Sequence, residues 1–279
     1  MKKSQKISLV ALFKIVLLTM LYQAPLHAEE LSGYDIIYNA EERYNGDSRE
    51  NNSTMVMINA RGEKRIRKMK QYRKDFGENL KDEKTMTFFT SPSDINNTAY
   101  LNFDWDEENK DDDSWLFLPA LKKVKRLASA DKSDAFLGSD FTYTDIGSSK
   151  RHFWNYTVIN ESDMVDGHDC WVVEGLPREE IKGKVIRETG YQKVNIWVRK
   201  DIFMKVKGKF WIKKGKRIKY FKVSEAAKIG DVWVAVTQQM VTTKAKRVEH
   251  QTVMKMSNIK YNVPLDDSFF TTQQMKRGL

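Results

Sequence analysis

A helical pattern occupies residues 32–46. Ser32 followed by Asp35 three residues later fits a capping box, and Asn45-Gly46 is a typical stop signal. Between them, apolar residues recur at helical spacing: Ile36, Ile37, Ala40 and Tyr44. The spacing predicts a short helix with one apolar face, which must pack against another element.

Strand patterns dominate most of the remaining chain. Every second residue from Ile202 to Ile212 is apolar or glycine, and the residues between them are rich in lysine. This period of two is typical of a strand with one dry and one wet face. Turn sequences such as Asp166-Gly167 and Gly230-Asp231 separate further segments of this kind. We therefore expect about ten antiparallel strands at hairpin spacing.

These elements predict a mainly β fold. It is a large curved antiparallel sheet, an incomplete, half-open β-barrel, with a few short helices that form a lid. The dry face must be covered. Besides the first helix, the sequence offers an excursion over residues 130–146 and a terminal helix over 267–275. The apolar hollow between sheet and helices is then a natural lipid site.

We predict that the first helix and residues 136–146 form the lid over the dry face. Methionines on that face suit a site that accepts varied chain shapes, and they equally suit a packed core. The predicted ligand-binding residues of the lid and the adjoining strand are Ile37, Tyr44, Trp115, Phe117, Leu118, Phe136, Leu137, Phe141 and Tyr143. Those of the sheet are Ile196, Val198, Met204, Val206, Phe210, Val234, Val236, Met254 and Met256.

Residues 1–28 have the order of a secretory signal peptide. Three lysines precede a mostly apolar stretch, and Ala28 is a small residue at the expected cut. Lys14 divides the apolar stretch, so an uncleaved membrane anchor is the alternative. We expect cleavage after Ala28, a single domain over residues 29–279 and a periplasmic location.

Charge and composition exclude several classes of protein for this chain. The net charge is +10, but four lysines lie in the predicted signal, so the exported chain only weakly favours anionic partners. A mean hydropathy of −0.61 excludes an integral helical membrane protein for the body of the chain. Aromatic residues at 11% exclude a disordered chain. The single cysteine, Cys170, cannot form an internal disulfide.

Three further features have both a chemical and a structural interpretation. His168 and Cys170 could form a nucleophilic pair, but without an orienting motif a lone buried cysteine is favoured. The acidic run 104–113 could bind a divalent cation, but it lacks the glycine and glutamate of an EF-hand and favours a solvated hairpin tip. The basic clusters 122–126 and 213–217 suit anionic headgroups, an acidic partner or a wet strand face. We expect no cofactor and no metal.

Seven segments, taken in chain order, carry a family resemblance. They are YDIIYNAEERYNG at 34–46, FFTSPSD at 88–94, WLFLPA at 115–120, KKVKR at 122–126, FLGSDFTYTDI at 136–146, WVVEGLP at 171–177 and FFT at 269–271. Together they resemble the LolA-like family of periplasmic lipoprotein carriers, in its outer membrane lipoprotein-sorting branch. The resemblance covers nearly the whole exported chain and implies a half-open barrel whose cavity shields acyl chains.

The resemblance also implies function and partners. It indicates a monomeric carrier of lipids or lipoproteins, not an enzyme, that works with an inner-membrane transporter and an outer-membrane acceptor, and not with nucleic acid. Members of this branch accompany exporters of the resistance-nodulation-division class. Two alternatives stay open. One is a non-carrying accessory subunit of such an exporter, with the hollow filled by side chains, and the other is an envelope hydrolase.

Overall fold

An antiparallel sheet of thirteen strands forms the framework of the protein in our computed structural model. The strand order is β6-β5-β4-β3-β2-β1-β13-β12-β11-β10-β9-β8-β7, so β6 and β7 form the two edges. The sheet is not closed into a barrel, which confirms the predicted mainly β, half-open fold. The structure describes residues 30–108, 110–147, 150–213 and 215–279, so the predicted signal peptide and its cut lie outside the described residues.

The strands are long and mostly joined by hairpins. The first half contains β1 (Ser48–Asn59), β2 (Lys64–Phe76), β3 (Asp82–Ser91), β4 (Ala99–Asp104), β5 (Asp113–Leu118) and β6 (Lys123–Leu127). The second half contains β7 (Trp154–Val165), β8 (His168–Pro177), β9 (Tyr191–Arg199), β10 (Lys205–Ile212), β11 (Arg217–Ile229), β12 (Val232–Lys244) and β13 (Arg247–Tyr261). Pairing of β1 with β13 joins the two halves into one sheet.

The helices are short. They are α2 (Gly33–Glu42), α3 (Tyr143–Ile146), α4 (Lys182–Thr189) and α5 (Thr272–Arg277). Within the described ranges, none of the helices has the length and apolar character to cross a membrane.

Helix α2 begins as predicted. The Ser32 hydroxyl accepts a hydrogen bond from the Asp35 amide, and the Asp35 carboxylate accepts one from the Ser32 amide, each at 3.2 Å. Ile37 is fully buried and packs with Val173 and Val198 of the sheet. The helix ends at Glu42, so Tyr44 lies beyond it, and α2 covers the inner face of β8 and β9.

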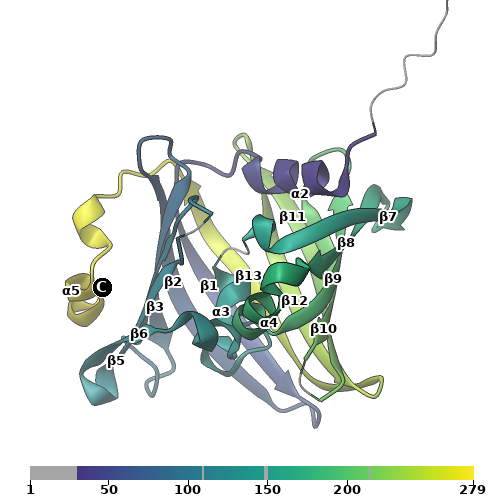
Figure 1. Cartoon of the computed structure of the whole chain (residues 1–279). Coiled ribbons are helices and arrows are strands. Elements are labelled where there is room, and N and C mark those ends of the chain that lie inside the picture. The colour runs from purple at the N-terminus through teal and green to yellow at the C-terminus, as the bar shows by residue number, and fades with distance from the viewer. Residues whose placement is uncertain (1–29, 109, 148–149, 214) are drawn as a thin grey trace, which may run out of the picture. The chain divides into compact units, whose positions relative to one another are not determined.

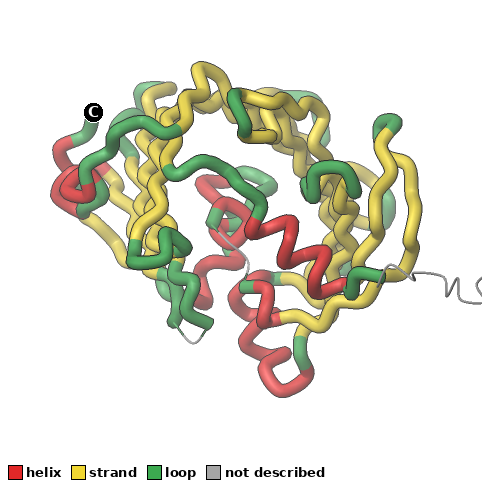
Figure 2. Tube along the Cα trace, turned by 90° about the horizontal axis from the view of Figure 1, so that it is seen from above, coloured by secondary structure: helices red, strands yellow, loops and turns green. Residues whose placement is uncertain are grey.

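The sheet carries apolar residues on both faces. Helix α3 lies within its curve, α4 lies at the open side between its two edges, and α5 lies outside it (Figures 1 and 2). Phe270 and Met275 of the C-terminal segment are fully or nearly fully buried against Phe88 and Leu101. The terminal helix therefore covers the outer face of the sheet, not the hollow.

Residues 128–147 leave the sheet after β6 and cross its inner face. This segment, which we call the excursion, contains the 3-10 turns Ser129–Ser133 and Phe136–Gly138 and then α3. Phe136 is fully buried, and its ring centroid lies 6.0, 5.5 and 5.3 Å from those of Phe89, Tyr100 and Tyr143. An aromatic cluster thus fixes the excursion against the sheet.

Candidate functional site

A cavity of about 780 Å³ lies between the sheet and the helices. One part of its wall is apolar and comes from α2, the excursion, β7 and the strands β9 to β12. These residues are Ala40, Phe141, Trp154, Tyr156, Val194, Ile196, Met204, Phe210, Phe221, Ala235 and Met240. A cavity of this size and lining is typical of small-molecule sites.

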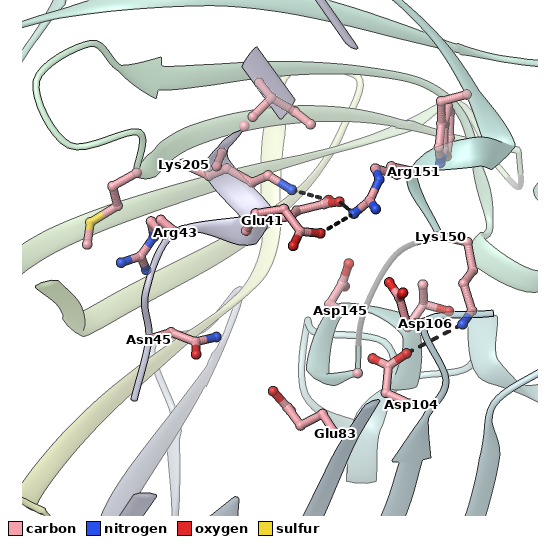
Figure 3. Close-up of a pocket in the computed structure, with 18 of the residues that line it drawn as sticks. Glu41, Arg43, Asn45, Glu83, Asp104, Asp106, Asp145, Lys150, Arg151 and Lys205 are labelled. Atoms are coloured by element: carbon pink, nitrogen blue, oxygen red, sulfur yellow. Dashed lines mark hydrogen bonds and ion pairs between the residues drawn. The ribbon is translucent and has the colours of Figure 1, made fainter. Parts of the chain in front are cut away.

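Charged side chains form the other part of the wall. Figure 3 shows Arg43, Lys205 and Arg151 toward one side of the cavity, with Glu83 and Asp106 toward the other. The cavity is therefore amphipathic, with an apolar floor and a charged rim. Such a lining matches a ligand that has one apolar and one polar end.

Glu41 bridges two of these cations. Lys205 Nζ donates to Glu41 Oε1 at 2.7 Å, and Arg151 Nη1 lies 3.5 Å from Glu41 Oε2. Arg151 also donates to Glu42 at 3.0 Å. These ion pairs tie the end of α2 to β10 and to the segment before β7, and they close the rim on that side.

Arg73 on β2 forms a network of hydrogen bonds and ion pairs at the opposite end of the cavity. Its guanidinium is buried and donates to the Gly46 carbonyl at 2.7 Å, to Asn45 Oδ1 at 2.9 Å and to Asp75 Oδ1 at 2.6 Å. It also pairs with Glu83. Burial, with further repulsion from Glu83, raises the pKa of Asp75 to about 6, although Arg73 opposes the shift. This carboxyl therefore titrates close to neutral pH.

Asp145 of α3 joins the excursion to the cavity floor. Both of its carboxylate oxygens lie 2.8 Å from the Tyr191 hydroxyl, which donates to them. Lys219 Nζ is 3.7 Å from the same carboxylate. Burial, and then the adjacent Asp145 charge, raise the pKa of Tyr191 well above its ordinary value. The phenol stays protonated and holds α3 on β9.

Five of the predicted ligand-binding residues line this cavity. They are Tyr44, Phe141, Ile196, Met204 and Phe210. Tyr44 is half exposed at the rim, whereas Phe141 and Met204 are almost fully buried. Their role in ligand binding stays a prediction.

The placement of Trp115 and Phe117 in the cavity wall is wrong. Both pack in the outer cluster with Phe270 and Met275, whereas Leu118 packs against the inner cluster. Successive side chains of a strand point to opposite faces, so Phe117 and its neighbour Leu118 cannot share one wall.

Several other predicted residues are core and not wall. Leu118, Phe136, Leu137, Tyr143 and Met254 belong to or pack against the inner cluster beside the cavity. Ile37 and Val198 are fully buried under α2, and Met256 is buried on β13. None of these side chains lines the cavity. The excursion and α2 fill much of the predicted hollow, because their large apolar residues are themselves packed on the sheet.

A bulge corrects the prediction for β10. Lys205 pairs with Val198, and Lys207 pairs with the next residue, Trp197, so Val206 is an extra residue in the ladder. A bulge changes which face the flanking residues occupy. Lys205 lines the cavity, whereas Val206 is buried with Cys170 and Met204 and does not line it.

The assignment of Val234 and Val236 to the wall is also wrong. The ladder between β11 and β12 shifts register between Val223 and Ala226, opposite this part of β12. Ala235 lines the cavity there, and neither Val234 nor Val236 does. An irregular, more strongly twisted ladder breaks the simple period of two.

The pattern analysis missed the charged rim. The alternating pattern predicts that a lysine such as Lys205 is solvated, whereas it lines the cavity beside a bulge. The sequence Glu41-Glu42-Arg43, placed directly after the apolar face of α2, was the available signal. A charge cluster at the end of a lid helix lies where the hollow meets solvent.

Cys170 is not an activated nucleophile in this structure. It is fully buried, and its thiol donates to the His168 carbonyl at 3.5 Å. Burial raises the pKa of the thiol to about 11. The reactive form of cysteine is the thiolate, so this environment disfavours nucleophilic catalysis.

The acidic run 104–113 connects β4 and β5 as the hairpin tip that we predicted, and Asp106, Glu107, Glu108 and Asp111 in it are exposed. Lys150 Nζ lies 2.8 Å from Asp112 and 3.6 Å from Asp104, and Lys132 Nζ lies 3.3 Å from Asp112. Lysines from the excursion and from the segment before β7 thus pair with Asp104 and Asp112, which are less exposed than the tip itself. Among the described residues, no group of three or more acidic, histidine or cysteine side chains has the arrangement of a metal site.

Comparison with known proteins assigns the family. A family model described as that of an uncharacterized protein matches residues 81–277, which is most of the chain. The chain belongs to the DUF1329 family. A DUF1329 protein from Desulfovibrio piger is 28% identical, with a TM-score of 0.77 over 87% of this chain and 97% of that one. No curated protein matches the sequence.

Two further solved structures share the DUF1329 fold. A domain assigned to the outer membrane lipoprotein-sorting proteins of Vibrio parahaemolyticus is 27% identical, with a TM-score of 0.74 over 88% of this chain and 98% of that one. A LolA superfamily protein from Nitrosomonas europaea is 20% identical, with a TM-score of 0.65 over 88% of this chain and 99% of that one. The resemblance to the LolA-like fold is thereby confirmed.

Proposed function

We propose that this DUF1329 protein is a periplasmic carrier that holds the acyl chain of a lipid or lipoprotein in its cavity. The amphipathic cavity of about 780 Å³ is the observation that carries the proposal. The Vibrio relative, a lipoprotein-sorting domain by its description, supports it. In this proposal the protein receives cargo from an inner-membrane exporter and passes it to an outer-membrane acceptor.

The energetics favour a cavity of this kind for transfer. Each methylene exposed to water costs about 0.8 kcal/mol, so an acyl chain needs an apolar shelter in the periplasm. Met204 and Met240 in the wall adapt to different chain shapes because their side chains are flexible. The charged rim would keep the polar end of the cargo in contact with solvent.

A second candidate is an accessory subunit of an exporter that carries no lipid. The observation that favours it is the packed aromatic cluster around Phe136, which fills the inner face beside the cavity. A folded protein without acyl-chain affinity would support this candidate.

Filling the cavity tests the carrier function. Ala235→Phe places a ring into the apolar part of the wall without introducing charge. We expect the variant to fold and to lose at least tenfold in affinity for a fluorescent acyl probe. Ala60→Phe, at the exposed turn between β1 and β2, is the matched control and should bind like the wild type. Equal binding by Ala235→Phe and wild type, or no probe binding by the delipidated wild type, would contradict the proposal.

A further inference from the structure

Arg43 at the rim lacks a carboxylate partner; of the other described arginines and lysines that line the cavity, only Lys207 also lacks one, and its ammonium lies 4.3 Å from the Trp197 ring centroid. Arg151 and Lys205 pair with Glu41, and Arg73 pairs with Asp75 and Glu83. Arg43, directly after α2, donates from Nη1 to the Trp233 carbonyl at 2.8 Å. In the part of the chain that the structure describes, no carboxylate lies within ion-pair distance of its guanidinium.

The surroundings of Arg43 leave its charge uncompensated. The side chain is partly buried, and burial lowers its pKa, with Tyr261 opposing and Arg73 adding to this effect. A guanidinium nevertheless keeps its charge, and only one of its two terminal nitrogens donates to the Trp233 carbonyl. A desolvated cation of this kind favours an anionic ligand that can accept its remaining N–H groups.

Arg43 also stands where the apolar wall begins. Ala40, one turn earlier in α2, lines the cavity, and Ala235 lines it two residues after the Trp233 carbonyl that holds Arg43. Figure 3 shows Arg43 on the side of the cavity away from Glu83 and Asp106. A ligand whose chain lies on these alanines would place its polar end at the guanidinium.

We propose that Arg43 binds the anionic headgroup of the cargo, so that the cavity selects amphiphiles ending in a phosphate or carboxylate over uncharged ones. This inference rests on the proposed carrier function. Planar guanidinium groups bind both anions through paired hydrogen bonds. The acidic side of the rim, including Glu83 and Asp106, disfavours the opposite orientation of the anion.

The test compares the affinities of ligands that share one acyl-chain length and differ in headgroup. Delipidated protein is titrated with decyl phosphate, decanoate and decanol, each displacing an uncharged acyl probe. We expect the wild type to bind one or both anions at least tenfold more tightly than decanol. The two anion arms distinguish a phosphate from a carboxylate headgroup. Arg43→Gln should bind all three ligands about as the wild type binds decanol, and Arg43→Lys should keep part of the preference.

The control is Lys182→Gln, which removes a cation outside the cavity lining that already pairs with Glu179 at 3.0 Å. It should leave the preference for anions unchanged. An Arg43→Gln protein, folded by circular dichroism, that still prefers anions would overturn the inference, as would a wild type without preference. If Arg43→Gln does not fold, Arg43→Lys decides: a preference for anions as large as that of the wild type would overturn the inference. Binding of none of the three ligands would instead contradict the carrier function itself.

Discussion

His250 on β13 forms an ion pair with Asp140 of the excursion, 110 residues earlier in the chain. The Asp140 carboxylate is buried and also accepts hydrogen bonds from the Thr242 and Thr252 hydroxyls, at 2.6 and 2.7 Å. The Asp140 amide donates to Thr252 Oγ1 at 2.9 Å. A single side chain of the lid is thus fixed by three residues of β12 and β13.

Removal of the Asp140 carboxylate should loosen the excursion. Asp140→Ala leaves the two threonine hydroxyls without their buried acceptor, and hydrogen bonds to a charged group contribute roughly 1.5–3 kcal/mol each. We expect a loss of about 3 kcal/mol in the free energy of unfolding, measured by urea denaturation. Asp106→Ala, at an exposed rim carboxylate, is the control. A loss below about 1 kcal/mol in Asp140→Ala would contradict this account of the lid.

His250 should make stability depend on pH. The hydrogen bond to Asp140 raises the pKa of His250 in the folded protein. Its contribution is therefore complete below the unfolded-state pKa of about 6.5 and is lost as pH rises through the folded-state value. Melting temperatures of the wild type should fall between pH 6 and pH 8 by more than those of His250→Gln. His168→Gln, at an exposed histidine, should behave like the wild type.

Substitutions at Phe136 and Phe210 should distinguish a residue of the packed core from a residue of the cavity wall. Phe136→Ala removes the centre of the aromatic cluster and should cost about 3–5 kcal/mol in stability. Phe210 is only half buried and lines the cavity, so Phe210→Ala should cost less and lower the affinity for an acyl probe. Unfolding and probe binding are measured on both variants. The reverse ranking in stability would show that the cluster around Phe136 is not the packed core of the lid.

Local patterns predicted the elements well and the site only in part. The capping box of α2 and the strand alternation are set by neighbouring residues, so sequence could identify them. The face of Val206 depends on a bulge, and the cover over Phe117 is a helix more than 140 residues later. Neither is a local property. The charged rim combines side chains from α2, β2, β3 and β10, so no single segment displays it.

Cys170 should be unreactive in the folded protein. Burial keeps the thiol protonated at neutral pH, because its pKa is raised to about 11. N-ethylmaleimide at pH 7.5 should label the native protein at least a hundredfold more slowly than the urea-unfolded protein. His168→Ala should not change the native rate, since the thiol contacts only the backbone carbonyl of that residue. Rapid labelling of the native protein that depends on His168 would support the hypothesis that His168 and Cys170 form a nucleophilic pair.

Asp75, like His250, should make the folded protein less stable as pH rises, but over a more acidic range. Its pKa in the folded protein is about 6, above the ordinary value of 3.8 for aspartate. The folded state therefore holds a proton that the unfolded state has lost between these values, and stability falls as pH rises from about 4 to about 6. Above pH 6 the ionised carboxylate destabilises the fold by roughly 3 kcal/mol relative to the protonated one.

Asp75→Asn removes this ionisation and keeps an oxygen that can accept from Arg73. We expect the variant to be more stable than the wild type at pH 7.5 and to lose that advantage at pH 4.5. Urea denaturation at both pH values measures the difference, and Asp106→Asn on the exposed rim serves as control. If Asp75→Asn were less stable at pH 7.5, the ion pair with Arg73 would outweigh burial, and the carboxylate would be ionised and stabilising at the rim.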